Sequence, residues 1–350
     1  MDQSASARHF KIAIYGAGSL GTVLGAYLAQ AGLDVLLVNR NTAHVEGLRA
    51  QGAQIRGTVN MTVPVKACLP DEMTGEFDLI FLLTKQLDNP RIIPTIAPLL
   101  GQAGVLCTLQ NGFPEAAIAE ILGAERTFGC AVSWGATLLG GGKAELTSDP
   151  AHVSFSIGAI ADGQTTTLNA IRDVLQYMGE VEIEHDFRGA RWSKLLVNCS
   201  FSGMSAVLGA TFGEVADNKI ARRCAQAIMK ECLDVARAAH IQPQPIQGKD
   251  IAKLFDYHGP IKQWLSFQLI PFAIRKHRSL KASMLQDLEK GRLTEVDSIN
   301  GMVSAYGRQF GVPTPFNDHV VKIVHQIEAG QMSPVMANLG EFAHLLACRS

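Results

Sequence analysis

Three polar residues are spaced so that one face of a helix in the second half of the chain can do chemistry. Lys194, Asn198 and Ser202 stand four residues apart among apolar neighbours, and residues with this spacing share one face of an α-helix. A lysine on a mostly apolar helix either extends its ammonium group to solvent or is held for a reaction. Spacing alone favours the first explanation, and the second requires a partner for the ammonium group.

A candidate partner for this lysine lies in a later polar segment of the chain. Glu295 can pair with Lys194 across the cleft between two domains, and Ser283 offers a hydroxyl to the carboxylate of a substrate. Taken alone, Glu295 has the features of an exposed helix acid, as Asp297 does. A lysine paired with a carboxylate at a cleft is typical of an active site, so the pair favours a reaction.

A glycine-rich turn near the start of the chain points to a cofactor. The apolar run 10–15 leads into Gly16-x-Gly18-x-x-Gly21, and a helical pattern begins at once. Gly16 permits a tight turn, Gly18 lets the backbone approach a pyrophosphate, and Gly21 lets the helix pack closely on the strand. The helix then offers its first N–H groups to the phosphates. We predict a dinucleotide-binding turn made by Gly16, Ala17, Gly18, Ser19, Leu20 and Gly21.

The end of the next strand indicates which dinucleotide binds. An enzyme that uses NAD usually places an Asp or Glu there, as an acceptor for the ribose 2′-hydroxyl. Here the strand ends Val38-Asn39-Arg40 without a carboxylate. The guanidinium of Arg40 can instead bind the 2′-phosphate of NADP through two hydrogen bonds, so the sequence favours NADPH.

Two further segments follow strands, at the edge where a doubly wound sheet binds its ligands. Lys85 comes after the strand DLIFLL and can add charge near the cofactor phosphate. Asn111 comes after VLCTL and can hydrogen-bond the ribose or nicotinamide side of the cofactor. Position alone equally allows each of them an ordinary loop role.

The elements that must position these residues follow from hydrophobic periodicity. We predict a helix from Ser19 to Ala31 and strands at 10–15, 34–39, Val63–Ala67, Leu79–Leu83 and Val105–Thr108. The β-rich segment from Gly129 to Phe155 fits antiparallel strands added to the edge of this sheet. A helix at about 165–178 and a strand at Glu180–Glu184 follow, and the remainder is helical. The expected fold is α/β, with a Rossmann-type doubly wound domain at 9–187 and an all-helical domain at 188–350.

Composition excludes several classes of protein. With 350 residues, of which 47% are hydrophobic and 18% charged, both domains can bury a core. The net charge of -1 gives no reason to expect nucleic acid or an acidic membrane as partner. Seven cysteines without CxxC spacing indicate reduced thiols in a cytosol and no metal site. Met1–Arg8 lack the apolar core of a signal peptide, and no run is long enough to span a membrane.

Five motifs together resemble the ketopantoate reductase (2-dehydropantoate 2-reductase) family. They are GAGSLG at 16–21, TKQ at 84–86, QNG at 110–112, WSKLLVN at 192–198 and SMLQDLEKGRLTEVDSING at 283–301. Their order is that of the family, and they extend from residue 10 to about 320. The last motif is the most specific, since no generic Rossmann enzyme needs it.

The resemblance implies a role for each of these residues in a cytoplasmic NADPH-dependent reductase. Lys194 would be the general acid and Glu295 would position it beside the cofactor. Asn198, Ser202 and Ser283 would hold a small 2-oxo acid substrate. Asn111 would lie at the junction of cofactor and substrate, while the 2′-phosphate would be bound by Arg40 and Lys85.

Two positions depart from the family pattern. Ser202-Gly203 replaces a common asparagine and proline, and Leu280 stands where a third asparagine is common. Both family asparagines are expected to bind polar groups of ketopantoate, and loss of such partners changes discrimination strongly. Three alternatives therefore stay open: reduction of another 2-oxo acid, an opine-type or 6-phosphogluconate-type dehydrogenase, and a non-catalytic NADP sensor. A homodimer also stays open.

Overall fold

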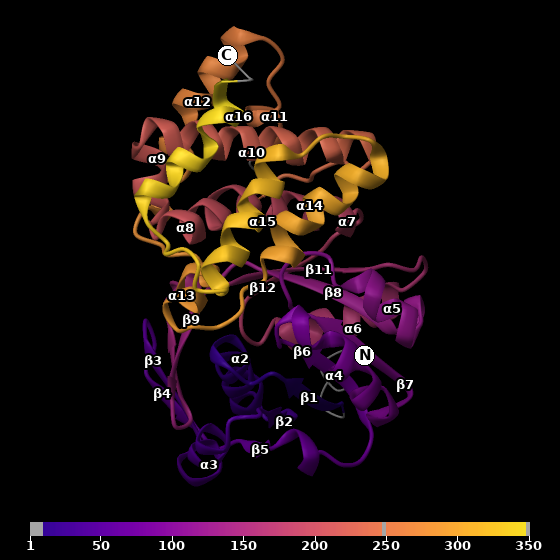
Figure 1. Ribbon diagram of the computed structural model, residues 1–350. Helices are drawn as coiled ribbons and strands as arrows, with labels where there is room; N and C mark the ends of the chain where they lie inside the picture. The colour runs from indigo at the N-terminus through magenta and orange to yellow at the C-terminus, as the bar shows by residue number, and fades with distance from the viewer. Residues whose placement is uncertain (1–9, 247–249, 348–350) are drawn as a thin grey trace. The chain divides into compact units, whose positions relative to one another are not determined.

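Apolar runs in the first half of the chain form one large sheet (Figure 1). The computed structural model describes residues 10–246 and 250–347; the expectations for Met1–Arg8 and for Cys348 lie outside them. Eight strands follow the order β12-β11-β8-β7-β6-β1-β2-β5. All neighbours are parallel except β8 and β11. The strands are β1 (Lys11–Tyr15), β2 (Asp34–Val38), β5 (Lys66–Cys68), β6 (Phe77–Leu82), β7 (Leu100–Thr108), β8 (Thr127–Val132), β11 (Ser154–Ala159) and β12 (Glu180–Ile183).

Both faces of this sheet are covered, as the prediction of a doubly wound fold requires. Along β1, Ile12 and Ile14 belong to one buried cluster, while Ala13 and Tyr15 belong to another. Successive side chains of a strand point to opposite faces, so each cluster is the core on one face. The first core takes side chains from α2 (Ser19–Gln30), α3 (Thr42–Gln51) and α6 (Thr165–Leu175), and the second takes them from α4 (Asn89–Ile96) and α5 (Glu115–Leu122).

The segment expected to be one strand at Val63–Ala67 forms two strands in different sheets, so that prediction is wrong. Strand β4 (Met61–Val63) ends just before Pro64, and β5 begins at Lys66. Proline has no N–H to donate to a neighbouring strand and interrupts the ladder. Strand β4 belongs to a second, four-stranded sheet with the order β4-β3-β10-β9.

The antiparallel strands predicted between Gly129 and Phe155 are present, but only some of them extend the large sheet. Strand β11 pairs antiparallel with β8, as expected. The hairpin of β9 (Ala136–Gly140) and β10 (Lys143–Leu146) instead joins β3 (Ala53–Gly57) in the second sheet. Strands β3, β4, β9 and β10 all pack against α2. The second sheet therefore supports the helix that follows the glycine turn.

The remainder of the chain forms helices around one long central helix (Figure 1). The central helix α10 (Lys219–Ala238) begins at Asn218, whose side chain accepts from the amides of Ile220 and Ala221. The other helices are α7 (Phe187–Val197), α8 (Gly203–Leu208), α9 (Phe212–Asp217), α11 (Ile251–Phe255), α12 (Pro260–Ala273), α13 (Ser283–Glu289), α14 (Val296–Phe310), α15 (Pro315–Glu328) and α16 (Ala343–Ala347).

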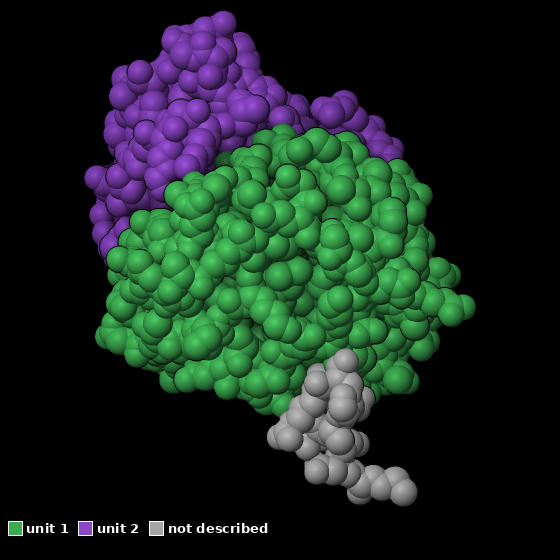
Figure 2. Space-filling model, turned by 90° about the horizontal axis from the view of Figure 1, so that it is seen from below, with its two compact units in different colours: residues 1–110, 114–187 green, residues 111–113, 188–350 purple. Residues whose placement is uncertain are grey.

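The chain divides into two compact units, coloured separately in Figure 2. Unit 1 contains both sheets and ends at Phe187, and unit 2 contains the helices from Arg188 onward. The loop Asn111–Phe113, which follows β7 in the sequence, is part of unit 2. Within the described ranges, no helix is both long and apolar enough to cross a membrane.

Candidate active site

The glycine turn joins β1 to α2 and is fastened to the end of β2. Gly16 has a φ of +104°, a conformation that favours glycine. The amides of Gly16 and Ala17 both donate to the carbonyl oxygen of Val38, at 3.0 and 2.9 Å. The turn therefore has a fixed position at the carboxyl ends of two neighbouring parallel strands, where α/β sheets bind ligands.

The shape of this turn fits a dinucleotide. A Cβ on Gly16 would lie 2.7 Å from the backbone nitrogen of Thr84, and a Cβ on Gly21 would lie 2.6 Å from the carbonyl oxygen of Gly16. Only glycine permits this packing of turn, helix and β6. The N-cap of α2 is Gly18, which has no side chain with which to cap the helix. The first amides of α2 can then bind a pyrophosphate.

Two side chains that the sequence analysis missed orient the carbonyl of Ala17 within this turn. Asn39 Nδ2 donates to that oxygen at 2.7 Å, and Thr22 Oγ1 donates to it at 3.1 Å. Asn39 stands at the end of β2, where an NAD enzyme usually has an acid, and a polar side chain at this place is a signal for a residue of the binding site. Thr22 gave no such signal, because a threonine in a helix usually has only a local role.

A buried histidine links this turn to the second sheet. His44 is 1% exposed; its Nε2 lies 3.0 Å from Thr22 Oγ1, and its Nδ1 accepts the amide of Gly142 at 3.1 Å. Thr22 already donates to Ala17, so its oxygen must accept from Nε2. These bonds require a neutral ring with its proton on Nε2, and burial lowers the pKa of His44 accordingly.

The stability of the protein should depend on His44 below neutral pH. The unfolded chain takes up a proton near the ordinary histidine pKa of about 6.5, whereas the folded chain takes it up only at lower pH. The unfolded state therefore binds more protons in this window, so stability falls as the pH drops below about 6.5. Urea unfolding at several pH values should show a shallower fall for His44→Gln than for the wild type. The control His277→Gln, at an exposed histidine, should keep the wild-type slope; an equal slope for His44→Gln would contradict this expectation.

Arg40 lies at the end of β2 with its side chain 77% exposed. Its Nη1 is 3.5 Å from Asp88 Oδ2, and the other oxygen of Asp88 is 3.7 Å from Arg91. Lys85 is the N-cap of the short 3₁₀ turn 86–88 that carries Asp88. The strands β2 and β6 lie on either side of β1. Arg40 follows β2 and Lys85 follows β6, so the two residues follow the strands that flank the glycine turn. An exposed ion pair is worth at most about 1 kcal/mol, so a phosphate dianion can compete for Arg40.

A pair of buried amides, also missed, connects the loops that follow β6 and β7. Gln110 Nε2 donates to Asn89 Oδ1 at 2.7 Å and to the carbonyl of Thr84 at 2.8 Å. Asn89 Nδ2 donates back to Gln110 Oε1 at 2.9 Å. The TKQ and QNG motifs of the sequence are therefore bonded to each other, which fixes the backbone immediately before Asn111.

Lys194 lies near the carboxyl end of α7, and buried neighbours fix the rotation of this helix. Trp192 is 0% exposed, and its Nε1 donates to the carbonyl of Cys232 at 3.0 Å. Ser193 Oγ donates to the carbonyl of Gln244 at 2.6 Å. Lys194 is partly exposed, and these two buried neighbours fix the side of α7 from which its side chain leaves the helix.

The helix that carries Lys194 is not regular, in contrast to the sequence-based expectation. Asn198–Ser202 forms a π-helical turn, and the amide of Gly203 donates to the carbonyl of Asn198, five residues back. In an α-helix, residues eight apart diverge by about 80° around the axis. Each residue of a π-turn rotates less about the helix axis than a residue of an α-helix does. Ser202 therefore lies closer to the face of Lys194 than it would in a regular α-helix. Such turns are frequent at functional sites.

Two other predicted site residues belong to helices that pack against this turn. Ser283 is the first residue of α13, where it is exposed, and Glu295 is the N-cap of α14. Both α13 and α14 contact the π-turn. Lys194 and Glu295 belong to the same unit, as the predicted helical domain at 188–350 requires. A pair between them would therefore form within unit 2 and not between the two units. Asp297 is exposed, as expected, and its Oδ2 lies 3.0 Å from His325 Nε2.

Two family descriptions match the chain. "Ketopantoate reductase PanE/ApbA" matches residues 12–161, and "Ketopantoate reductase PanE/ApbA C terminal" matches residues 186–328. The two matches cover the residues of the glycine turn and those of the lysine helix respectively.

Individual relatives match over nearly their whole lengths. The chain is 28% identical to the 2-dehydropantoate 2-reductase of Lactococcus lactis, over 91% of this chain and 98% of the relative. The enzyme of that name from Pyrococcus horikoshii is also 28% identical, over 88% and 94%. Among solved structures, D-mandelate dehydrogenase with NADH and anilino(oxo)acetate matches with a TM-score of 0.79 at 25% identity, over 91% of this chain and 99% of that one.

Proposed function

This chain belongs to the ketopantoate reductase family, and we propose that it reduces the 2-oxo group of 2-dehydropantoate with NADPH to give pantoate. Unit 1 would bind the cofactor, and unit 2 would bind the oxo acid and supply the proton. The observation that carries the proposal is the packing of α13 and α14 against the π-turn that follows Lys194, since it groups the elements that bear the candidate substrate and acid residues.

The cofactor assignment rests on chemistry at the ends of β1 and β2. The uncapped start of α2 suits a pyrophosphate, and the exposed Arg40 suits a 2′-phosphate. Lys85 would add a second positive charge near that phosphate, and Asn111 would bond the ribose or nicotinamide side. When bound, NADPH supplies the hydride that reduces the carbonyl carbon.

The proton would come from Lys194. As the carbonyl carbon of the substrate gains hydride, its oxygen becomes an alkoxide, and the ammonium of Lys194 both stabilises that charge and donates a proton to it. Solvent then returns a proton to the neutral amine. Glu295 would hold the ammonium group in place beside the cofactor, while Asn198, Ser202 and Ser283 would bind the substrate.

A second candidate is the reduction of a different 2-oxo acid. It is favoured by the likeness to D-mandelate dehydrogenase, which was crystallised with NADH and anilino(oxo)acetate. Ser202 and the 48% exposed Leu280 also offer fewer polar groups than the asparagines that the motifs lead one to expect. A substrate with an aryl or alkyl group in place of the hydroxyl of 2-dehydropantoate would suit such a site.

A panel of oxo acids separates the two candidates. Oxidation of NADPH should be fastest with 2-dehydropantoate, and slower with 2-oxoisovalerate, phenylglyoxylate and pyruvate, because a site that bonds the substrate hydroxyl discriminates strongly against analogues without it. Repeating the panel with NADH tests the cofactor. A preference for phenylglyoxylate would favour the second candidate, and no turnover with any oxo acid would contradict both.

We place this reaction in the cytoplasm. The six described cysteines form no disulfide and are all buried, and burial raises the pKa of Cys68 to about 11 and that of Cys224 to about 12. Protonated, buried thiols are poor nucleophiles and suit a reducing compartment.

A further inference from the structure

Three buried polar residues from three helices form a hydrogen-bonded chain that ends on the π-turn of unit 2. Asn300 Nδ2 donates to the carbonyl of Cys199 at 2.9 Å and to Asn317 Oδ1 at 3.0 Å. Asn317 Nδ2 donates to Glu231 Oε2 at 2.8 Å. The exposure of Asn300 and Asn317 is 0%, and that of Glu231 is 1%. The chain connects α10, α15 and α14 to the turn.

The carboxylate of Glu231 anchors this chain. It accepts the backbone amides of Phe316 and Asn317, each at 3.0 Å, and these are the second and third residues of α15. A negative charge at a helix N-terminus satisfies amides that have no partner inside the helix. Glu231 therefore fixes the start of α15 and, with it, the side chain of Asn317.

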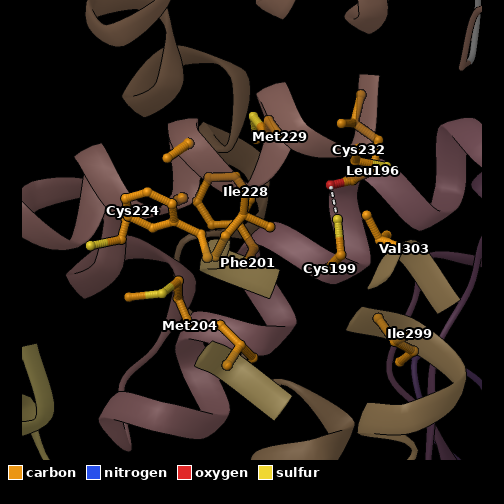
Figure 3. Close-up of a cluster of buried hydrophobic side chains, with 14 of the residues drawn as sticks. Leu196, Cys199, Phe201, Met204, Cys224, Ile228, Met229, Cys232, Ile299 and Val303 are labelled. Carbon is orange, nitrogen blue, oxygen red and sulfur yellow. Dashed lines mark hydrogen bonds between the residues drawn. The ribbon is translucent and has the colours of Figure 1, made fainter. Parts of the chain in front are cut away.

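The carbonyl of Cys199, which receives the last bond of the chain, loses its regular helical donor at the π-turn. In an α-helix the amide of Gly203 would donate to Cys199, but here it donates to Asn198 and Ser200. Figure 3 shows the surroundings of Cys199 as apolar, with Met229 from α10 and Ile299 and Val303 from α14 among the side chains drawn. Leaving a buried carbonyl without a partner is costly, and the amide of Asn300 supplies a donor in place of Gly203.

Gly203 makes room for Asn300. A Cβ on Gly203 would lie 2.8 Å from Asn300 Oδ1 and 3.1 Å from its Nδ2. Within the part of the chain that the structure describes, Oδ1 of Asn300 has no hydrogen-bond partner. The side-chain amide of Asn300 therefore makes two hydrogen bonds through its nitrogen, while its buried oxygen makes none within the described residues.

We propose that Asn300 is a positioning residue for the substrate. By holding the carbonyl of Cys199 it keeps the π-turn formed, and the π-turn begins at Asn198 and ends at Ser202. Since this inference rests on the proposed function, in which those two side chains bind the oxo acid, loss of Asn300 should weaken binding of the oxo acid and leave binding of NADPH unchanged.

Ser304 provides a matched control on the same helix. It lies one turn after Asn300 and is 3% exposed, and within the described ranges its Oγ has no hydrogen-bond partner. Ser304→Ala therefore changes a polar side chain at similar depth in α14 without breaking the chain to the turn. This variant controls for the loss of a polar group from the buried face of α14 while the bonds to the turn stay intact.

The test compares Asn300→Asp and Asn300→Ser, which both lack the amide donors, with Ser304→Ala. With NADPH and 2-dehydropantoate, the Asn300 variants should show kcat/KM for the oxo acid lowered by about ten- to hundredfold, as displaced binding groups cause in other enzymes. The KM for NADPH should stay at the wild-type value. Equal kinetics in the Asn300 variants and Ser304→Ala would overturn the proposal.

Amide hydrogen exchange gives a readout that needs no turnover. Residues 198–204 should exchange faster in the Asn300 variants than in the wild type and in Ser304→Ala. If the wild type reduces no oxo acid, the proposed function fails, but this measurement still decides whether Asn300 holds the turn. Unchanged exchange at 198–204 would overturn that role.

Discussion

A Lys194→Met variant is expected to reduce 2-dehydropantoate about 10²–10⁴-fold more slowly than the wild type, with the affinity for NADPH little changed. Methionine preserves the length of the stem but can neither stabilise the alkoxide nor donate a proton, and general acid catalysis contributes a factor of this size. Stopped-flow oxidation of NADPH measures the step, and fluorescence titration measures the binding of the cofactor.

Lys230→Met is the matched control for this variant. Lys230 is also on a helix of unit 2, its side chain is 15% exposed, and it pairs with Asp234. Its loss should affect stability but not kcat. Turnover by Lys194→Met that equals turnover by Lys230→Met would remove Lys194 from the mechanism.

Arg40→Asp is expected to change the choice of cofactor. If Arg40 binds the 2′-phosphate as proposed, the variant would lose two hydrogen bonds to it and would place a carboxylate beside it. Juxtaposed like charges cost several kcal/mol, so the KM for NADPH should rise about a hundredfold. The KM for NADH should change little, because the ribose of NADH carries no phosphate. Steady-state kinetics with both cofactors give the comparison.

Lys66→Asp is the control for the charge reversal. Lys66 is 71% exposed and bonds Asp34, at the other end of β2, at 2.7 Å. This variant should leave both KM values as they are in the wild type. A rise of equal size for NADPH and NADH in Arg40→Asp would count against binding of the 2′-phosphate by this residue.

Local chemistry explains why the glycine turn and the fold class were predictable. Gly16 and Gly21 have their roles because of atoms a few residues away or in the adjoining strand, and the pattern GxGxxG after an apolar run encodes that geometry directly. The sheet followed from apolar runs bounded by polar segments. The lysine helix was predicted for the same reason, since its apolar neighbours repeat with helical period.

The rest depends on partners that are distant in the sequence. Several hydrogen bonds join elements that are far apart in the sequence. They are the bond between Gln110 and Asn89, the bonds of Asn39 and His44 around the glycine turn, and the bond from Asn300 to the π-turn. No periodicity marks such pairs, because the geometry arises only when the elements pack. The hairpin of β9 and β10 was assigned to the wrong sheet for this reason: alternation shows that a strand forms, but not which strand it pairs with.

The role of Lys194 can be decided by a crystal structure of the chain with NADP and pantoate. We expect Lys194 Nζ to lie about 2.6–3.2 Å from the C2 hydroxyl oxygen of pantoate, the distance over which a general acid acts. Lys194 directed away from that oxygen, with another proton donor in its place, would contradict this role.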